Sequence, residues 1–363
     1  MRACYPSPVL LSVPLLHRAA RPRATGSAAT RNDSRARALV EEHGWNSTAH
    51  QVLDPGMRHW FSRAGDAVVG YAQIAGYRVV AGAPVAAGAR LLDVAEEFEA
   101  ASRRAGQRVC YFGAEERFAA ALDDGHGRHL IGYQPTWDLG TWASRYDSDK
   151  SLRAQRNRAA NKGVWASEMT PEHESSPEVA ACHAAWLAGK RLPRLGFLAH
   201  SRAAGNDAGS VAGRRLFVAR LPDTSVAAYL TACPVPGRHG WLIDKVVRTP
   251  GAPNGTAELL IDTAARALAP GSRRLTLGLA PLSWTLHLEN GPGAPSDLGT
   301  PGWLTRLERL AVRHGRRFYD FAGLYAFKRK FRPDAWEPVY LLRRGGRLGP
   351  GTMLALAGAF LLA

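Results

Sequence analysis

The spacing of apolar residues changes along the chain in a fixed order, and that order occurs twice. In residues 60–85, apolar and polar side chains alternate in short runs that are separated by glycine-containing turns, a pattern typical of strands. Apolar residues then recur at helical spacing in residues 91–104, and another strand-like run follows. The same order returns between residues 215 and 278. The sequence therefore predicts an α+β fold of two similar halves, each a strand-rich meander followed by a helix and a strand.

The individual elements follow from the same patterns. Strands are expected at residues 108–112, 129–133, 215–219, 226–232, 240–247, 273–278 and 336–342, and helices at 91–104, 114–122, 151–162, 177–188, 257–268 and 303–314. Thr256 is the expected N-cap of the helix at 257–268, because its hydroxyl can accept from the first free backbone N–H groups.

Both ends of the chain are expected to lie outside the two halves. Residues 1–40 are interpreted as a disordered extension, 41–190 as the first half, 191–345 as the second, and 346–363 as a short apolar tail. The tail has no charge from Met353 onward and is shorter than the roughly 20 residues that a membrane-spanning helix needs. It is expected to lie at a membrane interface, to pack as a terminal helix, or to form the first part of a span.

The charge of the chain indicates the kind of partner. Lys and Arg exceed Asp and Glu by 16, and the isoelectric point is about 10.3. Such an excess favours a polyanionic partner, either nucleic acid or an anionic membrane. The four cysteines are far apart and form no CxxC pair, which argues against a disulfide scaffold and a structural zinc site. We therefore predict a reducing compartment and no metal site.

A rigid turn precedes the helix of the second half. Residues 249–255 read Thr-Pro-Gly-Ala-Pro-Asn-Gly and follow a strand that carries Asp244 and Arg248. Such a turn directs backbone N–H groups and a helix N-terminus to one place, where a phosphate or a developing oxyanion binds well. The alternative is that proline and glycine merely form a tight connection between strand and helix.

Aromatic and cationic residues are interleaved near the C-terminus. Residues 318–331 read Phe-Tyr-Asp-Phe-Ala-Gly-Leu-Tyr-Ala-Phe-Lys-Arg-Lys-Phe, and Trp336-Glu337-Pro338 follows. This composition suits a surface that binds an anionic head group or stacks on nucleotides. The alternative is an aromatic stripe in the core with a solvated charged face.

Four motifs in this order resemble the catalytic region of the phosphatidylglycerol lysyltransferases, the bacterial multiple peptide resistance factors. They are Ala-Pro-Asn-Gly at 252–255, Gly-Leu-Ala-Pro-Leu at 278–282, the aromatic run from 318, and Trp-Glu-Pro at 336–338. The resemblance covers residues 45–343. It implies tandem acetyltransferase-like (GNAT) halves, each with a mixed, mostly antiparallel sheet, around a tunnel that aminoacyl-tRNA and lipid enter from opposite sides.

The sequence departs from the family pattern in three places. Ala83 stands in Gly82-Ala83-Pro84 where the family usually has aspartate. Asp244 and Arg248 are one residue further apart than in the family's Asp-x-x-Arg, so either Arg248 in a shifted position or Lys245 takes the place of the family's arginine. The large N-terminal membrane-spanning flippase region of the family has no counterpart in the sequence.

The resemblance implies an aminoacyltransferase that moves an amino acid of the lysine or alanine class from aminoacyl-tRNA to the hydroxyl of phosphatidylglycerol. The aminoacyl ester is already activated, so no cofactor, nucleotide or metal is expected. The enzyme is expected in the cytoplasm, peripheral at the inner face of the cell membrane. Another hydroxyl lipid remains a possible acceptor.

Two other functions are compatible with parts of the sequence. An acyl-CoA-dependent GNAT would need an Arg/Gln-x-x-Gly-x-Gly/Ala loop for pyrophosphate, but residues 103–108 and 202–207 both fail at its last position. A nucleic-acid binder without activity would explain the charge but not the Pro-Asn-Gly turn.

The residues expected to serve this reaction fall into three groups. Asp244 is expected to hold the aminoacyl ammonium or to act as base, and Arg248, Asn254 and Gly255 to bind phosphate or oxyanion. Lys328 and Lys330 are expected to bind the lipid phosphate, and Tyr325 and Phe327 to line the acyl chains. The basic helix is expected to contact the tRNA backbone, or else to be a solvated face, through Arg153, Arg156, Arg158 and Lys162.

Overall fold

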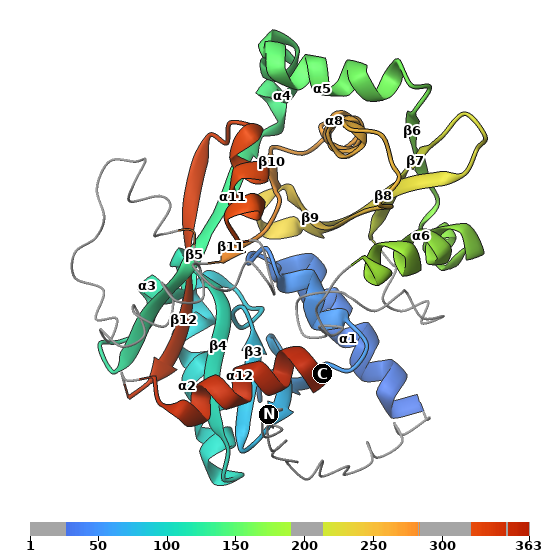
Figure 1. The fold of residues 1–363 in the computed structure, drawn as a ribbon. Coiled ribbons are helices and arrows are strands. Elements are labelled where there is room, and N and C mark those ends of the chain that lie inside the picture. Colours follow the sequence, from blue (N-terminus) through green and yellow to red (C-terminus); the bar gives the residue numbers. More distant parts are fainter. Residues whose placement is uncertain (1–26, 190–212, 282, 284–320, 346–347, 363) are drawn as a thin grey trace, which may run out of the picture.

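The computed structural model describes residues 27–189, 213–281, 283, 321–345 and 348–362 (Figure 1). Its helices, with short 3₁₀ helices marked η, are α1 (Ser27–His43), η1 (Ala49–Leu53), η2 (Gly88–Arg90), α2 (Leu91–Arg104), α3 (Glu116–Ala121), α4 (Leu139–Ser148), α5 (Lys150–Ala160), η3 (Pro171–Ser175), α6 (Pro177–Ala188), η4 (Pro236–Arg238), α8 (Thr256–Leu268), α11 (Phe321–Lys330) and α12 (Pro350–Leu362). Its strands are β1 (Arg58–Phe61), β2 (Val68–Ile74), β3 (Tyr77–Ala81), β4 (Arg108–Glu115), β5 (His126–Asp138), β6 (Trp165–Met169), β7 (Arg215–Arg220), β8 (Val226–Val235), β9 (Gly240–Arg248), β10 (Arg274–Thr276), β11 (Ala280–Pro281) and β12 (Ala335–Arg344).

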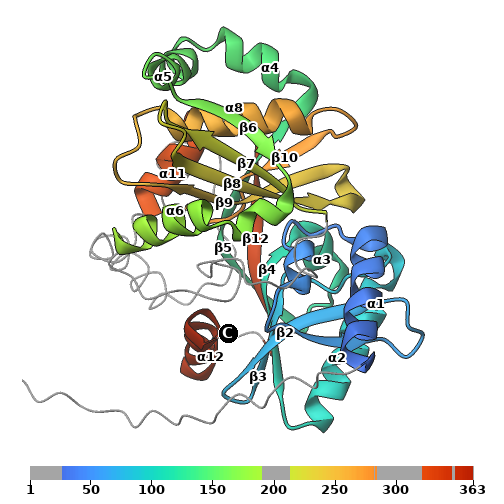
Figure 2. The same ribbon diagram turned by 90° about the vertical axis from the view of Figure 1, so that its right-hand side faces the viewer.

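The described strands form one twisted sheet in the order β1-β2-β3-β4-β12-β5-β10-β9-β8-β7-β6, with β11 paired to β5 (Figures 1 and 2). The same unit occurs in each half of this sheet. Helix α2 connects the parallel strands β3 and β4, and helix α8 connects the parallel strands β9 and β10. The remaining strand pairs are antiparallel. The α+β fold of two similar halves is therefore confirmed.

An exchange of strands joins the two halves. Strand β12, near the C-terminus, lies beside β4 of the first half, whereas β5, from the first half, lies beside β10 of the second. The two exchanged strands also pair with each other along most of their length. Elements α4, α5, β6 and α6 pack on the second half, so the packing does not change at the boundary expected at residue 190.

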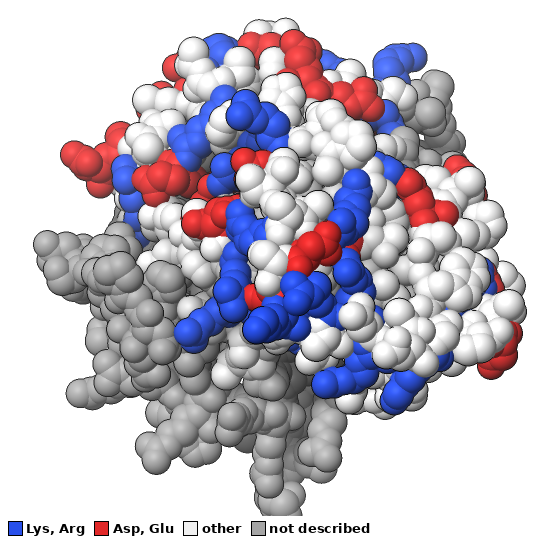
Figure 3. Space-filling model, turned by 90° about the horizontal axis from the view of Figure 1, so that it is seen from above, with Lys and Arg blue, Asp and Glu red and all other residues white. Residues whose placement is uncertain are grey.

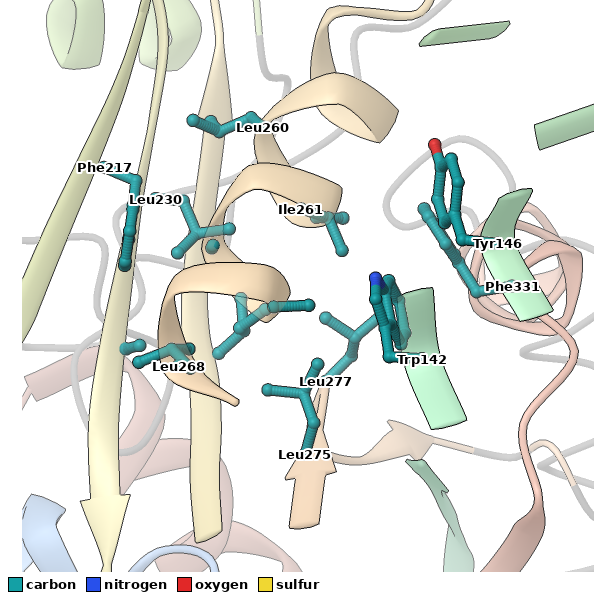
Figure 4. Packing of buried hydrophobic residues seen from close by; sticks show 14 of the residues in the cluster. Trp142, Tyr146, Phe217, Leu230, Leu260, Ile261, Leu268, Leu275, Leu277 and Phe331 are labelled. Atoms are coloured by element: carbon teal, nitrogen blue, oxygen red, sulfur yellow. The ribbon is translucent and has the colours of Figure 1, made fainter. Parts of the chain in front are cut away.

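Apolar side chains fill both faces of the sheet. In the second half, Leu260 of α8 points toward Leu230, whereas Ile261 points toward Trp142 and Tyr146, and Phe331 belongs to the same core (Figure 4). Helix α6 covers the opposite face of β7, β8 and β9. In the first half, α2 and α3 cover one face and α12 covers the other. Each half of the sheet is thus a layer between helices, as its nearly continuous apolar strands require.

The N-terminal part of the chain corrects one expectation. Residues 27–40 belong to helix α1 and are not a disordered extension. Ala36, Leu39 and Val40 follow helical spacing, and their side chains are buried against Val52 and Val68. The many arginines of this segment conceal that apolar stripe in the composition. Residues 1–26 lie outside the described part of the chain.

The other expected elements agree with the structure to within a few residues, and the apolar tail proves to be a terminal helix, α12, packed on β2 and β3. The helix expected at 303–314 lies outside the described residues. Helices α1, α4 and α11, strands β6 and β11 and the short 3₁₀ helices had no predicted counterpart. Among the described residues, no helix combines the length and apolar character that are needed to cross a bilayer.

Candidate active site

Strand β9 is irregular at Asp244. Ile243 pairs with Ala232 of β8 and Lys245 pairs with Thr231, so Asp244 is the extra residue of a β-bulge. The Thr231 hydroxyl donates to Asp244 Oδ1 at 2.6 Å. The bulge therefore places two consecutive side chains, Asp244 and Lys245, on the face of the sheet that α6 covers. It also lies within the stretch where the sequence has one residue more than the family pattern.

A buried polar cluster surrounds these two side chains. Lys245 Nζ lies 3.0 Å from Glu174 Oε1 of η3, and both side chains are almost fully buried. Arg214, which precedes β7, donates through Nη2 to Asp54 Oδ1 at 2.7 Å. The cluster consists of Asp54, Glu174, Arg214, Tyr229, Thr231, Asp244 and Lys245. Charges buried in this way persist only when they are paired.

The cluster shifts the ionisation of its own members. Burial would lower the pKa of Arg214, but the nearby Cys233, Asp244, Asp54 and Glu174 raise it, so the guanidinium stays charged. Burial, together with Glu174, Cys182 and Asp244, raises the pKa of Tyr229, whose hydroxyl lies 2.6 Å from His183 Nδ1. In the described residues, no three His, Cys, Asp or Glu side chains are grouped so as to hold a metal ion.

Strands β9 and β10 part beside Asp244. They pair only at Gly240, Trp241 and Leu242, whereas β9 continues to Arg248. The chain after β10 is bound by Lys328 of α11, whose Nζ donates to the carbonyl oxygens of Gly278 and Leu279 at 2.8 Å each. The part of β9 that contains Asp244 therefore forms no pair with β10.

Burial of Lys328 lowers its pKa to about 7, and a pH-dependent stability follows. Between about pH 7 and pH 10.5 the unfolded chain binds more protons than the folded one, so the free energy of unfolding rises with pH. We expect the free energy of unfolding of wild type, minus that of Lys328→Met, to rise by about 1 kcal/mol per pH unit from pH 7 to 9, as measured by urea titration. The matched variant Lys162→Met, at an exposed position, should show a flat difference. A flat difference for Lys328→Met as well would contradict the prediction.

The turn after β9 has the expected shape, but its surroundings differ. Arg248 Nη1 donates to the carbonyl oxygen of Ala252 at 3.2 Å, within the turn itself. Gly255 has φ +94° and a buried backbone that lies against Gln155 of α5. The N-cap is Gly255 and not Thr256, because the Thr256 hydroxyl donates to the carbonyl oxygen of Pro253 at 2.7 Å. Asn254 is exposed.

The catalytic residues expected from the sequence do not converge on one point. Asp244 shares a face with Thr231 and Leu216, which is the face covered by α6. Helix α8 covers the opposite face of the same strands. The structure thus groups Arg248, Asn254 and Gly255 at the N-terminus of α8, and groups Asp244 with the buried polar cluster. Residue spacing does not reveal a β-bulge, so the sequence could not predict which face of the sheet carries the Asp244 side chain.

Residues 321–330 of the aromatic and cationic run form helix α11, and the lysines of this helix contact other groups of the protein. Lys328 is buried on backbone carbonyl groups, and Lys330 forms an ion pair with the buried Glu258 of α8. In this arrangement the Nζ atoms of both lysines contact groups of the protein, whereas the sequence predicted that they bind a lipid phosphate. Tyr325 is buried with its ring 4.9 Å from that of Trp336, and Phe327 is half-buried.

Helix α5 and the turn after it divide the four expected tRNA-binding residues into two pairs. Arg156 lies between Asp147 and the buried Asp262, at 3.0 and 2.9 Å, and Arg153 donates to the carbonyl oxygen of Asp147. Arg158 and Lys162 are exposed instead. Figure 3 shows Lys and Arg gathered among acidic residues on the face seen from above Figure 1, where α4 and α5 lie. Arg158 and Lys162 therefore remain accessible to a polyanion.

The acid of the Trp-Glu-Pro motif has a structural place that its sequence did not reveal. Glu337 Oε1 lies 2.8 Å from Arg238 Nη2 and also contacts Arg274. The same Arg238 reaches Glu115 Oε2 of β4 at 2.9 Å. This network joins the exchanged strand β12 to both halves.

Sequence reasoning missed Asp54, Glu174, Arg214 and Tyr229 of the buried polar cluster. These residues come from the end of η1, from η3, from the residue before β7 and from β8, so no local motif connects them. The only signal that they could have shared is a charged or hydroxyl side chain within an apolar stretch of sequence. Only Tyr229 and Arg214 lie beside such a stretch.

Comparison with known proteins assigns the family. The family model described as "Phosphatidylglycerol lysyltransferase, C-terminal" matches residues 37–343. The phosphatidylglycerol lysyltransferase of Bacillus subtilis is 24% identical over 319 residues, which cover 85% of this chain and 35% of that protein. A bifunctional lysylphosphatidylglycerol biosynthesis protein of Gordonia bronchialis is 27% identical over 72% of this chain and 23% of its own length. The chain thus spans about a third or less of these relatives.

Two solved structures share the fold. The C-terminal domain of a putative lysylphosphatidylglycerol synthetase from Agrobacterium fabrum superposes with a TM-score of 0.72 at 21% identity, covering 92% of this chain and 98% of that one. L-PGS from Bacillus licheniformis gives a TM-score of 0.70 at 24% identity, covering 89% and 94%. The expected fold and the resemblance seen in the four motifs are both confirmed. This chain belongs to the phosphatidylglycerol lysyltransferase C-terminal family.

Proposed function

We propose that the chain transfers an amino acid of the lysine or alanine class from aminoacyl-tRNA to the hydroxyl of phosphatidylglycerol. The observation that carries this proposal is the family match over residues 37–343, which includes the bulged strand with Asp244 and the turn before α8. The relatives bear the name of this transfer to phosphatidylglycerol, and the positive charge of the chain suits both an RNA and an anionic lipid.

The chemistry is an exchange of esters. The oxygen of a lipid hydroxyl attacks the carbonyl carbon of the aminoacyl ester, the bond from that carbon to the tRNA ribose oxygen breaks, and the proton of the lipid hydroxyl passes finally to the ribose oxygen. An activated ester supplies the driving force, so positioning, proton transfer and charge stabilisation suffice.

The two groups of residues divide these tasks. Asp244, oriented by the Thr231 hydroxyl, holds the aminoacyl ammonium or accepts the proton. The N-terminus of α8, with Arg248, Asn254 and Gly255, binds a phosphate or the oxyanion. Lys328 acts at a distance, because its hydrogen bonds fix the chain that follows β10. Tyr325 and Phe327 line the path of the lipid.

The tRNA is proposed to approach α5, and this can be tested by its charge. Removing the exposed charges of Arg158 and Lys162, in Arg158→Gln with Lys162→Gln, should raise KM for aminoacyl-tRNA by about tenfold at low salt with little change in kcat. The control removes two exposed charges of α2, in Arg103→Gln with Arg104→Gln, and should leave KM unchanged. Equal KM values for the two double variants would exclude α5 as the tRNA surface.

The function as a whole is tested with a mixed pool of labelled aminoacyl-tRNAs and vesicles that contain phosphatidylglycerol, by mass spectrometry of the lipids. Labelled amino acid should appear in the lipid fraction and should be absent after RNase treatment of the donor. Transfer of an acetyl group from acetyl-CoA, without aminoacyl transfer, would overturn the proposal. The same assay identifies the amino acid. We place the enzyme in the cytoplasm, at the inner face of the membrane.

A further inference from the structure

Helix α12 presents an apolar surface to solvent. Residues 348–363 contain no charged side chain. The inner face of α12 packs through Ala355, Leu356 and Ala359 on β2 and β3. On its outer face Met353 is 39% and Leu354 67% exposed. These are two of the four large hydrophobic side chains that are exposed in the described part of the chain, and they are adjacent.

Arginine side chains border this surface. The Thr352 hydroxyl donates to the Tyr77 hydroxyl at 3.3 Å, and the exposed Arg108 reaches the same Tyr77 oxygen at 3.2 Å. Arg343 alternates in β12 with Leu341, which packs beneath α12, so both side chains lie on that face. Helix α12 and strands β2 and β3 contain no acidic residue. An exposed apolar stripe bordered by arginines is complementary to an anionic lipid surface.

Helix α11 lies on the same side of the sheet. Figure 2 shows α11 and α12 both to the left of the strands β5 and β12 that cross between the halves. Helix α11 carries the exposed Arg329. A membrane surface that contacts α12 would thus lie on the same side of the sheet as α11, the helix that lines the proposed lipid path.

We propose that α12 lies on the surface of an anionic bilayer, with Met353 and Leu354 inserted at the boundary of head groups and acyl chains and with Arg108 and Arg343 directed to lipid phosphates. The inference rests on the proposed function, since the acceptor is a membrane lipid. Helix α12 lies beyond residues 37–343, so family membership alone does not assign this role. Two exposed side chains are too few for a stable interface with a second copy, which buries about 800 Å² per partner, whereas shallow insertion of a helix needs little area.

The test is vesicle flotation of the full chain with the double variant Met353→Gln and Leu354→Gln. Vesicles of phosphatidylcholine with roughly one third phosphatidylglycerol should bind wild type, and the double variant should bind at least about tenfold more weakly. Vesicles of phosphatidylcholine alone should bind wild type weakly. The control is Trp165→Gln, which removes another exposed apolar side chain, 47% exposed on β6, and should bind like wild type.

Charge is tested separately from apolar contact. Arg343→Gln should weaken binding to the anionic vesicles severalfold, whereas Arg104→Gln, on the helix that covers the opposite face of the sheet, should not. Thermal unfolding of each variant should match wild type, because the replaced side chains of α12 point outward. Equal vesicle binding by wild type and the α12 double variant would overturn the proposal. Dimerisation of wild type that the double variant abolishes, without vesicle binding, would assign α12 to a second copy instead.

An activity arm distinguishes this inference from the proposed function. With phosphatidylglycerol in vesicles, the α12 double variant should transfer amino acid at a reduced rate, and with a short-chain, monomerically dispersed phosphatidylglycerol it should match wild type. Equal rates on vesicles would refute the role of α12 alone. Absence of transfer by wild type to either form of the lipid would refute the proposed function, while flotation would still decide whether α12 binds membranes.

Discussion

Gly255→Ala is expected to lower the free energy of unfolding by about 3–5 kcal/mol, as measured by urea titration of the helical signal. Gly255 has φ +94°, where a side chain is strained, and an added Cβ would lie 1.9 Å from the carbonyl oxygen of Gln155 and 2.9 Å from its carbonyl carbon. Both atoms belong to the backbone of α5, so no rotamer can relieve the contact. Helix α5 must therefore move away from α8.

The strain of the backbone and the steric contact can be separated. Gly271 has φ +74°, but an added Cβ there meets no atom within 4 Å. Gly271→Ala should thus cost only about 1–2 kcal/mol, the penalty of the conformation itself. Similar losses for the two variants would show that α5 yields easily at Gly255. In that case the ion pairs of Arg156 with Asp147 and Asp262 would not be strong enough to hold α5 in its position against α8.

Local patterns predicted the elements that bury one regular face. Helix α2 is amphipathic with Val94, Ala95 and Phe98 in the core, and its expected bounds agree with the structure. Strand β8 was recognised from its continuous apolar sequence, and helix α8 from its position after a rigid turn. In each case the residues that decide the structure are neighbours in the chain, so periodicity and turn chemistry are sufficient.

Long-range arrangements did not follow from the sequence. Nothing near Trp336 indicates that β12 inserts between β4 and β5, because that choice depends on pairing with strands about 200 residues away. Lys328 reads as a surface cation, and only the fold shows that carbonyl groups of Gly278 and Leu279 receive its ammonium group. The candidate site was thus predicted as a set of motifs, while its geometry depends on these distant contacts.

Asp244→Asn is expected to lower kcat/KM for aminoacyl transfer by about a hundredfold or more, with little loss of stability. The substitution keeps the size of the side chain and an oxygen that can accept from Thr231, but it removes the negative charge beside Arg214 and Lys245. Asp223→Asn is the matched control. Asp223 Oδ1 also accepts from a hydroxyl at 2.6 Å, that of Ser225, but it lies in an exposed turn, so transfer should be unchanged.

The kinetic form of the loss distinguishes the two roles of Asp244. If the carboxylate holds the aminoacyl ammonium, the variant should show a raised KM for aminoacyl-tRNA and an unaltered pH dependence of the remaining rate. If it accepts the proton of the lipid hydroxyl, kcat should fall and the acidic limb of the pH–rate profile should disappear. Wild-type kcat/KM in Asp244→Asn would exclude both roles and would move the chemistry to the N-terminus of α8, on the other face of the sheet. Because the bulge separates these two places, a single substitution decides between them.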